Sequence, residues 1–391
     1  MLGRLLAALL FAAAATQGSA QSFDTRATAA FVLDYATGTV LLDKNGDAPL
    51  PPASMSKLMT LYMAFEAIAQ GRLSIDDRLP VSEHAMSYGG STMFLDTTDR
   101  PRVDDLLRGI IVLSGNDASA VIAEALSPDG TEAGFAQLMT QRARELGLTN
   151  STFVNSNGWP AAGQRMSMRD LVALADKLIT DYPTFYPLFA ETTFEFDGRA
   201  PGNTQNRNPL LALGIGADGL KTGHTSEAGY GLVGSAKQGD RRVIFAVTGL
   251  ETEQMRAEES VRIVNWALRQ FVERQITQTG TRIADAEVWM GADSEVGLLV
   301  TEDIRLLLPA LEVDSLTAEV IYNGPVEAPI AEGQELGELL ITRGDMPEIR
   351  TPLVAEADVL RGGFGQRMRA AALVLITKVA PNADLSALPG A

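Results

Sequence analysis

The sequence predicts an α+β fold in two parts, an antiparallel sheet covered by a block of helices and then a small all-β, sandwich-like domain. In the first part, β-rich runs lie at both ends with helical patterns between them, which indicates an antiparallel sheet whose first and last strands pair. In the second part, residues 276–360, short β-rich stretches alternate with clusters of Gly, Pro and Asp. A length of 391 residues suits two domains.

Residues 1–20 predict an export signal that is not part of the fold. Arg4 supplies a positive charge, an apolar run of 11 residues covers 5–15, and Gly18-Ser19-Ala20 ends in small residues. A helix needs about 20 apolar residues to span a bilayer, so this run is too short. We expect cleavage after Ala20 and a periplasmic location; the alternative is a buried N-terminal helix.

The elements of residues 21–275 follow from periodicity and turn residues. Strands are expected at 30–34 and 39–42, joined by Ala36-Thr37-Gly38. Helical spacing covers 54–69, 103–114, 117–126, 134–146 and 168–179. Ser167 with Asp170 three positions later is a capping-box pattern. Strands at 230–235 and 242–249, with a turn at 237–240, precede a helix at 256–272.

Two smaller segments complete the chain. Residues 276–360 are expected to form a β-rich domain with strands at 286–290, 304–308, 317–322 and 338–342. Residues 361–391 hold 4 basic side chains and 1 acidic one, with apolar residues mostly on one helical face, although Leu373 lies on the other. Such a helix is too short and too charged to cross a membrane, so we expect an amphipathic anchor on the inner-membrane surface. The alternative is an ordinary surface helix.

Composition excludes several classes of function. The formal charge of −17, from 49 acidic and 32 basic side chains, argues against nucleic-acid binding. Residues 276–360 alone hold 17 acids and 4 bases. The chain has no cysteine, and its 2 histidines, His84 and His224, are too far apart in sequence to form a His-rich zinc site. We therefore expect no metal and no cofactor.

Three short motifs carry the chemistry. Ser54-Met55-Ser56-Lys57 matches S-x-x-K, Ser114-Gly115-Asn116 matches S-x-N, and Lys221-Thr222-Gly223 matches K-T-G. Each motif alone is weak. Together they occur in the expected order, the first at the start of a predicted helix, the second just before one and the third at a predicted strand. The alternative for Ser54 and Lys57 is a helix cap and a surface lysine.

The motifs suggest a serine activated by a lysine. Residues three apart share a helix face, so the Lys57 amine can reach the Ser54 hydroxyl and remove its proton. This requires a lowered lysine pKa, which desolvation and the nearby Lys221 cation would supply. Ser114 can relay a proton, and Asn116 can hold Lys57 and the substrate amide. The backbone N–H groups of Ser54 and His224 could form an oxyanion hole.

The motifs and their surroundings resemble the D-alanyl-D-alanine carboxypeptidases among the low-molecular-mass penicillin-binding proteins. The resemblance extends from about Phe31 to the end of the chain and includes the strings at 90–95, 114–118, 205–208 and 218–225. It implies a penicillin-recognising serine transpeptidase/β-lactamase-like domain, a small β-rich domain and a membrane anchor. By this resemblance, Ser54 is the acylated nucleophile and Lys57 its base.

The same resemblance assigns Arg256 to the terminal carboxylate of the substrate. A guanidinium and the hydroxyls of Thr222 and Thr225 suit a carboxylate. The alternative for Arg256 is the solvated start of a helix, beside Glu258 and Glu259. We expect the His224 side chain to neighbour the substrate rather than act as a base, and His84 to lie on the surface.

We therefore expect an exported carboxypeptidase that removes the terminal D-Ala from peptidoglycan stem peptides and is acylated by β-lactams. An endopeptidase or transpeptidase stays open, because only the second acceptor differs. A class A β-lactamase would need a glutamate for deacylation, yet none lies between Glu145 and Glu191. A non-catalytic wall-binding scaffold is the remaining alternative, which the complete set of motif residues disfavours.

Overall fold

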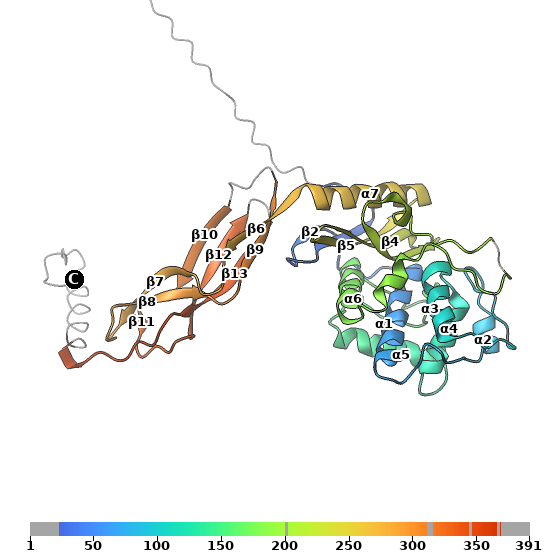
Figure 1. Cartoon of the computed structure of the whole chain (residues 1–391), viewed down its shortest axis with the longest axis horizontal. Helices are drawn as coiled ribbons and strands as arrows, with labels where there is room; N and C mark the ends of the chain where they lie inside the picture. The colour runs from blue at the N-terminus through green and yellow to red at the C-terminus, as the bar shows by residue number, and fades with distance from the viewer. Residues whose placement is uncertain (1–22, 200–201, 311–315, 344–345, 366–367, 369–391) are drawn as a thin grey trace, which may run out of the picture. The chain divides into compact units, whose positions relative to one another are not determined.

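The chain forms two compact units in the computed structural model, which describes residues 23–199, 202–310, 316–343, 346–365 and 368. The units divide between Gln270 and Phe271 (Figure 1). The expected boundary at Gln275 therefore falls inside a strand, β6 (Phe271–Thr277). The predicted export signal at 1–20 lies outside the described residues, as does nearly all of the predicted anchor helix.

The first unit is built on a five-stranded antiparallel sheet in the order β2-β1-β5-β4-β3. Its strands are β1 (Ala29–Asp34), β2 (Val40–Lys44), β3 (Ala217–Thr225), β4 (Gly229–Gln238) and β5 (Arg241–Leu250). β1 pairs with β5, with Phe31 opposite Ala246, so the expected meeting of the first and last strands is confirmed. β3, which carries the K-T-G motif, is an edge strand.

Helices connect β2 to β3 and follow β5. They are η1 (Ala53–Ser56), α1 (Lys57–Ala69), α2 (Glu83–Met86), α3 (Val103–Arg108), η2 (Gly109–Leu113), α4 (Asn116–Leu126), α5 (Glu132–Glu145), α6 (Met168–Asp181), η3 (Tyr186–Ala190), η4 (Leu211–Leu213) and α7 (Glu253–Arg269).

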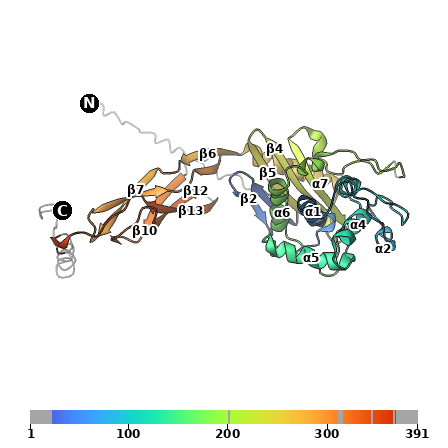
Figure 2. The same ribbon diagram turned by 60° about the horizontal axis from the view of Figure 1, so that its bottom comes forward.

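The two faces of the sheet are covered by different helices, because successive strand residues point to opposite sides. Phe31 and Ile244 pack into the core of the helical block that holds α1 and α3 to α6. Val32 and Phe245, each the next residue along, pack against Ile263 and Val264 of α7. The views from two directions show α7 on one side of the sheet and α1 and α6 on the other (Figure 1, Figure 2).

Three expected helices differ in detail from the structure. The expected helix 54–69 begins with a 3₁₀ turn, η1, before α1. The expected helix 103–114 changes from α to π at Gly109, and its apolar pattern continues because all five residues of η2 are buried. The expected helix 256–272 ends at Arg269, since Val272 pairs with Leu308 in β6. An apolar residue fits either element, so periodicity alone did not find these boundaries.

The second unit contains only strands among its described elements, apart from a short helical turn at residues 364–365. A six-stranded sheet has the order β10-β12-β13-β8-β7-β11, and β6 pairs with β9 in a second sheet. The strands after β6 are β7 (Arg282–Trp289), β8 (Glu295–Val300), β9 (Ile304–Pro309), β10 (Leu316–Tyr322), β11 (Val326–Glu327), β12 (Glu335–Arg343) and β13 (Met346–Ala355). Both sheets contribute to one core, in which Leu306 of β9 packs with Leu298 and Leu353. This agrees with the expected small sandwich-like domain.

None of the helices in the described part of the chain has the length and apolar content needed to cross a bilayer.

Candidate active site

Ser54 lies on η1, at the entrance of the helical block and beside the sheet. Ala53 before it has a φ of 48°, a left-handed conformation that costs an L-residue energy. Gly158 packs so tightly here that an added Cβ would lie 1.8 Å from the Ala53 carbonyl oxygen. The backbone that carries Ser54 is therefore held by tertiary contacts rather than by helix propensity.

Lys57, the first residue of α1, makes three hydrogen bonds in the site. Its Nζ donates to Ser54 Oγ at 2.9 Å, Asn116 Oδ1 at 2.7 Å and the Asn157 carbonyl at 2.6 Å. A neutral amine has two N–H groups and one lone pair. If Asn116 and Asn157 accept the two N–H groups, the lone pair of Lys57 faces the Ser54 hydroxyl, which is the arrangement of a general base.

The charge of Lys57 is strongly disfavoured by its surroundings. Its side chain is fully buried, and this desolvation, with the Arg207 cation, lowers its pKa to about 7. The Asp117 and Glu132 carboxylates oppose the shift. The amine is therefore close to half neutral at physiological pH, without any need for a metal or a histidine.

Ser114 and Asn116 lie between η2 and α4, where the chain reverses direction. Ser114 has a φ of 62°, and this left-handed residue ends the π-helix η2. Asn116 starts α4 and is held on both sides, since its Nδ2 donates to the Gly89 carbonyl at 2.9 Å and its Oδ1 accepts from Lys57. The buried Asp117 carboxylate accepts from the backbone N–H groups of Met93 and Leu95, which fixes the neighbouring loop.

Lys221 on β3 meets Ser114 from the sheet side. Its Nζ donates to Ser114 Oγ at 2.9 Å and more weakly to the Thr222 carbonyl at 3.3 Å. Burial lowers the Lys221 pKa well below its ordinary value, and the charges of Lys57 and two arginines, Arg207 and Arg256, lower it further. All three motifs thus meet: Lys57 contacts Ser54 and Asn116, and Lys221 contacts Ser114.

The edge strand β3 passes close to the nucleophile. A Cβ on Gly223 would lie 3.0 Å from the Pro52 carbonyl oxygen and 3.2 Å from Ala53 Cβ, so only glycine permits this approach. His224 follows with an exposed side chain, and its ring stacks on Tyr230 at a centroid distance of 3.9 Å. Thr225 Oγ1 accepts from the Ala228 N–H at 3.0 Å.

Arg256 lies on the first turn of α7 and is only 3% exposed, so the alternative of a solvated residue is wrong. Its guanidinium carbon is 5.8 Å from the centre of the Tyr230 ring, whose other neighbour is His224. Nη2 donates to Glu253 and to the Arg207 carbonyl, whereas Nε has no hydrogen-bond partner among the described residues. Arg256 therefore keeps donor capacity beside the end of the K-T-G strand.

Sequence reasoning missed three contributors. The carbonyls of Gly89 and Asn157 hold Asn116 and Lys57, and Arg207 supplies a cation beside the two lysines. Arg207 lies in a string that the resemblance included, without a role assigned to it. Asn157-Gly158 is a turn dipeptide, which indicates a loop but not its function. A carbonyl has no signature in a sequence, because every residue carries one.

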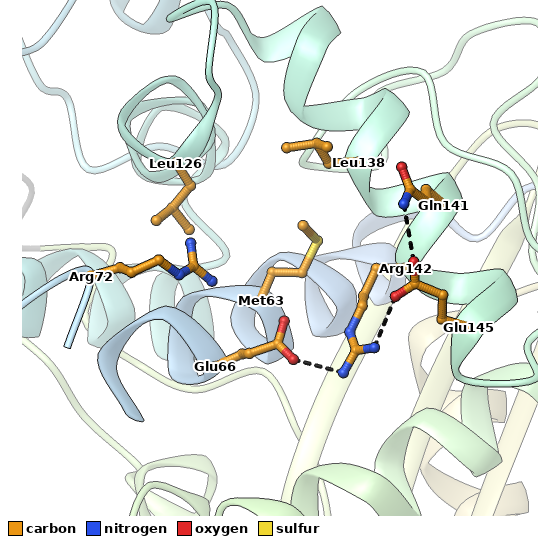
Figure 3. Close-up of a pocket in the computed structure, with 8 residues that line it drawn as sticks. All are labelled: Met63, Glu66, Arg72, Leu126, Leu138, Gln141, Arg142 and Glu145. Atoms are coloured by element: carbon orange, nitrogen blue, oxygen red, sulfur yellow. Dashed lines mark hydrogen bonds and ion pairs between the residues drawn. The ribbon is translucent and has the colours of Figure 1, made fainter. Parts of the chain in front are cut away.

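The largest cavity lies away from the catalytic residues, where α1, α4 and α5 meet (Figure 3). Its volume is about 160 Å³, and Arg142 bridges Glu66 and Glu145 on one side of it. It touches none of the motif residues. Across the described parts of the two units, no group of three or more His, Cys, Asp or Glu side chains could hold a metal ion.

Comparison with known proteins gives two family matches. A family described as D-alanyl-D-alanine carboxypeptidase matches residues 14–252, and one described as penicillin-binding protein 5, C-terminal domain, matches residues 271–361. The D-alanyl-D-alanine carboxypeptidase DacC of Escherichia coli is 36% identical over 373 residues, which cover 93% of this chain and 91% of that protein.

Two solved structures are similar over both units. The D-alanyl-D-alanine carboxypeptidase DacD of Francisella tularensis has a TM-score of 0.77 at 30% identity, covering 88% of this chain and 96% of its own. Penicillin binding protein 5 of Haemophilus influenzae has a TM-score of 0.73 at 32% identity, covering 86% of this chain and 98% of its own.

Proposed function

This chain belongs to the D-alanyl-D-alanine carboxypeptidase family, and from that premise we propose how its residues carry out the reaction. It is a serine-type D-Ala-D-Ala carboxypeptidase and a penicillin-binding protein of peptidoglycan metabolism. Ser54 is the nucleophile, and one observation carries this proposal. The amine of Lys57 contacts Ser54 Oγ while two other acceptors hold it in place.

Acylation begins when neutral Lys57 takes the Ser54 proton as Oγ attacks the carbonyl carbon of the D-Ala–D-Ala bond. The carbonyl oxygen becomes an oxyanion, which the N–H groups of Ser54 and His224 stabilise. The close approach of β3 to η1 at Gly223 supports this role. The C–N bond then breaks, and the proton passes to the leaving amine of D-Ala through Ser114, whose hydroxyl contacts Lys221.

Hydrolysis of the acyl-enzyme completes the cycle. Lys57, neutral again after the proton transfer, takes a proton from water as the water oxygen attacks the ester. The C–O bond to Ser54 breaks, and the proton returns to Ser54 Oγ. Asn116 holds Lys57 throughout, and its own amide is anchored by the Gly89 carbonyl.

Specificity for a free C-terminus comes from positive charge near the end of β3. Arg256 and the Thr222 and Thr225 hydroxyls bind the terminal carboxylate, and the unpartnered Nε of Arg256 supports this assignment. Lys221 adds a second cation, and its lowered pKa makes an anion beside it favourable. Gly223 leaves room for the substrate backbone along the strand.

β-Lactams are covalent inhibitors by the same chemistry. Their ring amide presents a carbonyl to Ser54, and the leaving nitrogen stays attached to the acyl group, so it hinders the attack of water. A similar protein of Haemophilus influenzae is named penicillin binding protein 5.

The enzyme acts outside the cytoplasmic membrane, in the periplasm. Its substrate is part of the cell wall, and the pattern of residues 1–20 is that of an export signal. The basic, amphipathic residues after Arg361 attach it to the membrane surface. Deleting them should leave D-alanine release unchanged and move the protein from the membrane pellet to the supernatant. Unchanged pelleting would disprove the anchor.

One experiment tests the mechanism. The protein is labelled with fluorescent penicillin, and D-alanine release is followed from a peptide ending in D-Ala-D-Ala. Ser54→Ala should lose both signals. Ser56→Ala is the matched control, because its hydroxyl donates to the Ala53 carbonyl and not to Lys57. No label on the wild type, or equal label on Ser54→Ala, would falsify the acyl-enzyme.

A further inference from the structure

Glu132 is a buried carboxylate to which the mechanism above assigns no role. It is the first residue of α5 and only 6% exposed. Its Oε1 accepts hydrogen bonds from the Ser156 N–H at 2.9 Å and from the Ser156 hydroxyl. Its Oε2 accepts from the Tyr88 hydroxyl at 2.6 Å and lies 2.7 Å from His84 Nε2. A single side chain thus joins two loops.

Each of these loops holds one group of the active site. Ser156 precedes Asn157, whose carbonyl accepts from Lys57 Nζ. The carbonyl of Ser156 itself accepts from Thr60 Oγ1 at 2.6 Å, one helical turn beyond Lys57. The Asn157 acceptor of Lys57 is therefore one residue away from a group bound by Glu132.

The second loop reaches Lys57 through Asn116. Tyr88 precedes Gly89, whose carbonyl accepts from Asn116 Nδ2, and Asn116 Oδ1 accepts from Lys57. Apart from Ser54, Lys57 has two acceptors, Asn116 and Asn157. Both are thus fixed by segments that the Glu132 carboxylate ties together.

Helix capping does not explain this arrangement. The N-cap of α5 is Thr131, whose side chain accepts from the Gly134 N–H at 3.0 Å. Glu132 at the first helical position has a favourable interaction with the helix dipole, but a surface carboxylate would have the same one. Burying a carboxylate is costly unless several donors satisfy it, as they do here.

We propose that Glu132 is a positioning residue for the general base, which clamps the loops before Gly89 and at Asn157 so that the Lys57 amine points at Ser54. This inference rests on the roles proposed for Ser54 and Lys57. Glu132 does not touch the reacting atoms. Its effect passes through two backbone carbonyls and through its negative charge.

The first measurement compares Glu132→Gln with the matched control Glu124→Gln in the full chain. Glu124, on α4, makes a hydrogen bond to Ser82 and none to a catalytic loop. Glutamine keeps the shape of Glu132 but turns an amide N–H₂ towards groups that need an acceptor. We expect the second-order rate of acylation by fluorescent penicillin to fall about 10- to 100-fold in Glu132→Gln, and to stay at the wild-type value in Glu124→Gln.

The pH profile separates positioning from a general loss of structure. The charged groups that act on Lys57 are Arg207, which lowers its pKa, and Asp117 and Glu132, which raise it. Removing the Glu132 charge should lower the Lys57 pKa, so the acid limb of the acylation profile should move to lower pH. His84 faces Glu132 as well, so the profile is repeated with His84→Asn in both backgrounds, where the limb that remains belongs to Lys57.

Tyr88→Phe provides a second, gentler variant. It removes one hydrogen bond from the clamp and leaves every charge in place, so acylation should slow while the acid limb stays where it is. If Glu132→Gln does not fold, this variant decides the question. A wild-type rate in Tyr88→Phe would then refute the clamp.

The possible failures are distinguishable. If Ser54→Ala still labels, the proposed mechanism is wrong and Glu132 has no base to position. If Ser54→Ala is silent while Glu132→Gln folds and matches Glu124→Gln in both rate and acid limb, the mechanism stands and only the role of Glu132 is rejected. A slowed Glu132→Gln variant with an unmoved limb would also reject it, because the charge would then have no influence on Lys57.

Discussion

Lys57 is fully buried, so its ammonium form loses hydration that the site replaces only in part. Its pKa of about 7 has burial as the main cause and the Arg207 cation as the second. Acylation needs the neutral amine. The rate should therefore fall as the pH drops below about 7, in contrast to an enzyme whose lysine titrates at its ordinary value.

Arg207 offers a direct test of this electrostatic picture. Because the cation disfavours the charged form of Lys57, Arg207→Gln should raise the Lys57 pKa and move the acid limb of the acylation rate to higher pH. The rate profile with penicillin gives the measurement. Arg102→Gln is the control, since Arg102 is paired with Asp76 on the surface and does not act on Lys57. A limb that stays in place, or moves to lower pH, would show that burial alone sets the pKa.

Arg256 should distinguish substrates with and without a free carboxylate. A hydrogen bond to a charged group contributes about 1.5–3 kcal/mol, so Arg256→Gln should lower kcat/KM about 10- to 150-fold for a peptide ending in D-Ala-D-Ala. For the same peptide with a C-terminal amide, the variant and wild type should be equally slow. Arg262→Gln is the control on the same helix, because Arg262 pairs with Glu259 away from the site. An equal loss on both peptides would reject the carboxylate role.

At the scale of elements, the approach of the 155–159 loop to η1 depends on Gly158. This residue has a φ of 82°, and a Cβ there would also lie 2.6 Å from Ser56 Oγ. Gly163 has a similar φ of 93°, but the nearest atom to its Cβ would be 3.4 Å away. The two glycines therefore share backbone strain and differ in space.

This pair predicts different outcomes for the same substitution. Gly163→Ala should cost about 1–2 kcal/mol of stability and leave acylation unchanged, because it introduces only left-handed strain. Gly158→Ala should be less stable still and lose at least about tenfold in acylation rate, since Ala53 and Ser54 must move. Urea unfolding and penicillin labelling measure both effects. Equal acylation in the two variants would mean that η1 tolerates displacement.

The start of α6 shows how far a local pattern predicts an element. Ser167 Oγ accepts from the Asp170 N–H at 3.1 Å, as a capping box requires. The Asp170 carboxylate does not complete the box at the start of its own helix. It accepts instead from the Asn150 N–H at 2.8 Å and the Ser151 hydroxyl at 2.7 Å. The helix start was predictable, whereas the partner of Asp170 was not, because that partner lies on another loop.

At the scale of the whole molecule, each unit has its own core, and the catalytic residues all belong to the first. Leu353, in the core of the second unit, is fully buried. Leu353→Ala should destabilise the second unit by about 2–5 kcal/mol and leave kcat/KM for D-alanine release unchanged. Thr317→Ala, at an exposed position on β10, should change neither.

The measurement combines urea unfolding, followed by circular dichroism, with activity at each urea concentration. In Leu353→Ala an early transition should appear while D-alanine release persists. Loss of activity in that early transition would show that the first unit depends on the second. The acidic charge of residues 276–360 would then have to be considered in catalysis as well.

The sequence by itself determined the fold class, the order of the elements and the residues of the three motifs. These features depend on neighbours along the chain: strand alternation, helical spacing, turn residues, and a lysine three positions after a serine. The five strands of the first unit and the pairing of its two ends follow from such patterns. So does the contact between Lys57 and Ser54.

Only the tertiary structure decided what holds and tunes the base. The carbonyl that accepts from Lys57 lies 100 positions away at Asn157, and the Glu132 carboxylate that fixes its loop is an ordinary acid at a helix start. Backbone carbonyls are identical in every residue, and burial belongs to the packed molecule. For that reason neither the acceptors of Lys57 nor its pKa could be found in the order of the amino acids.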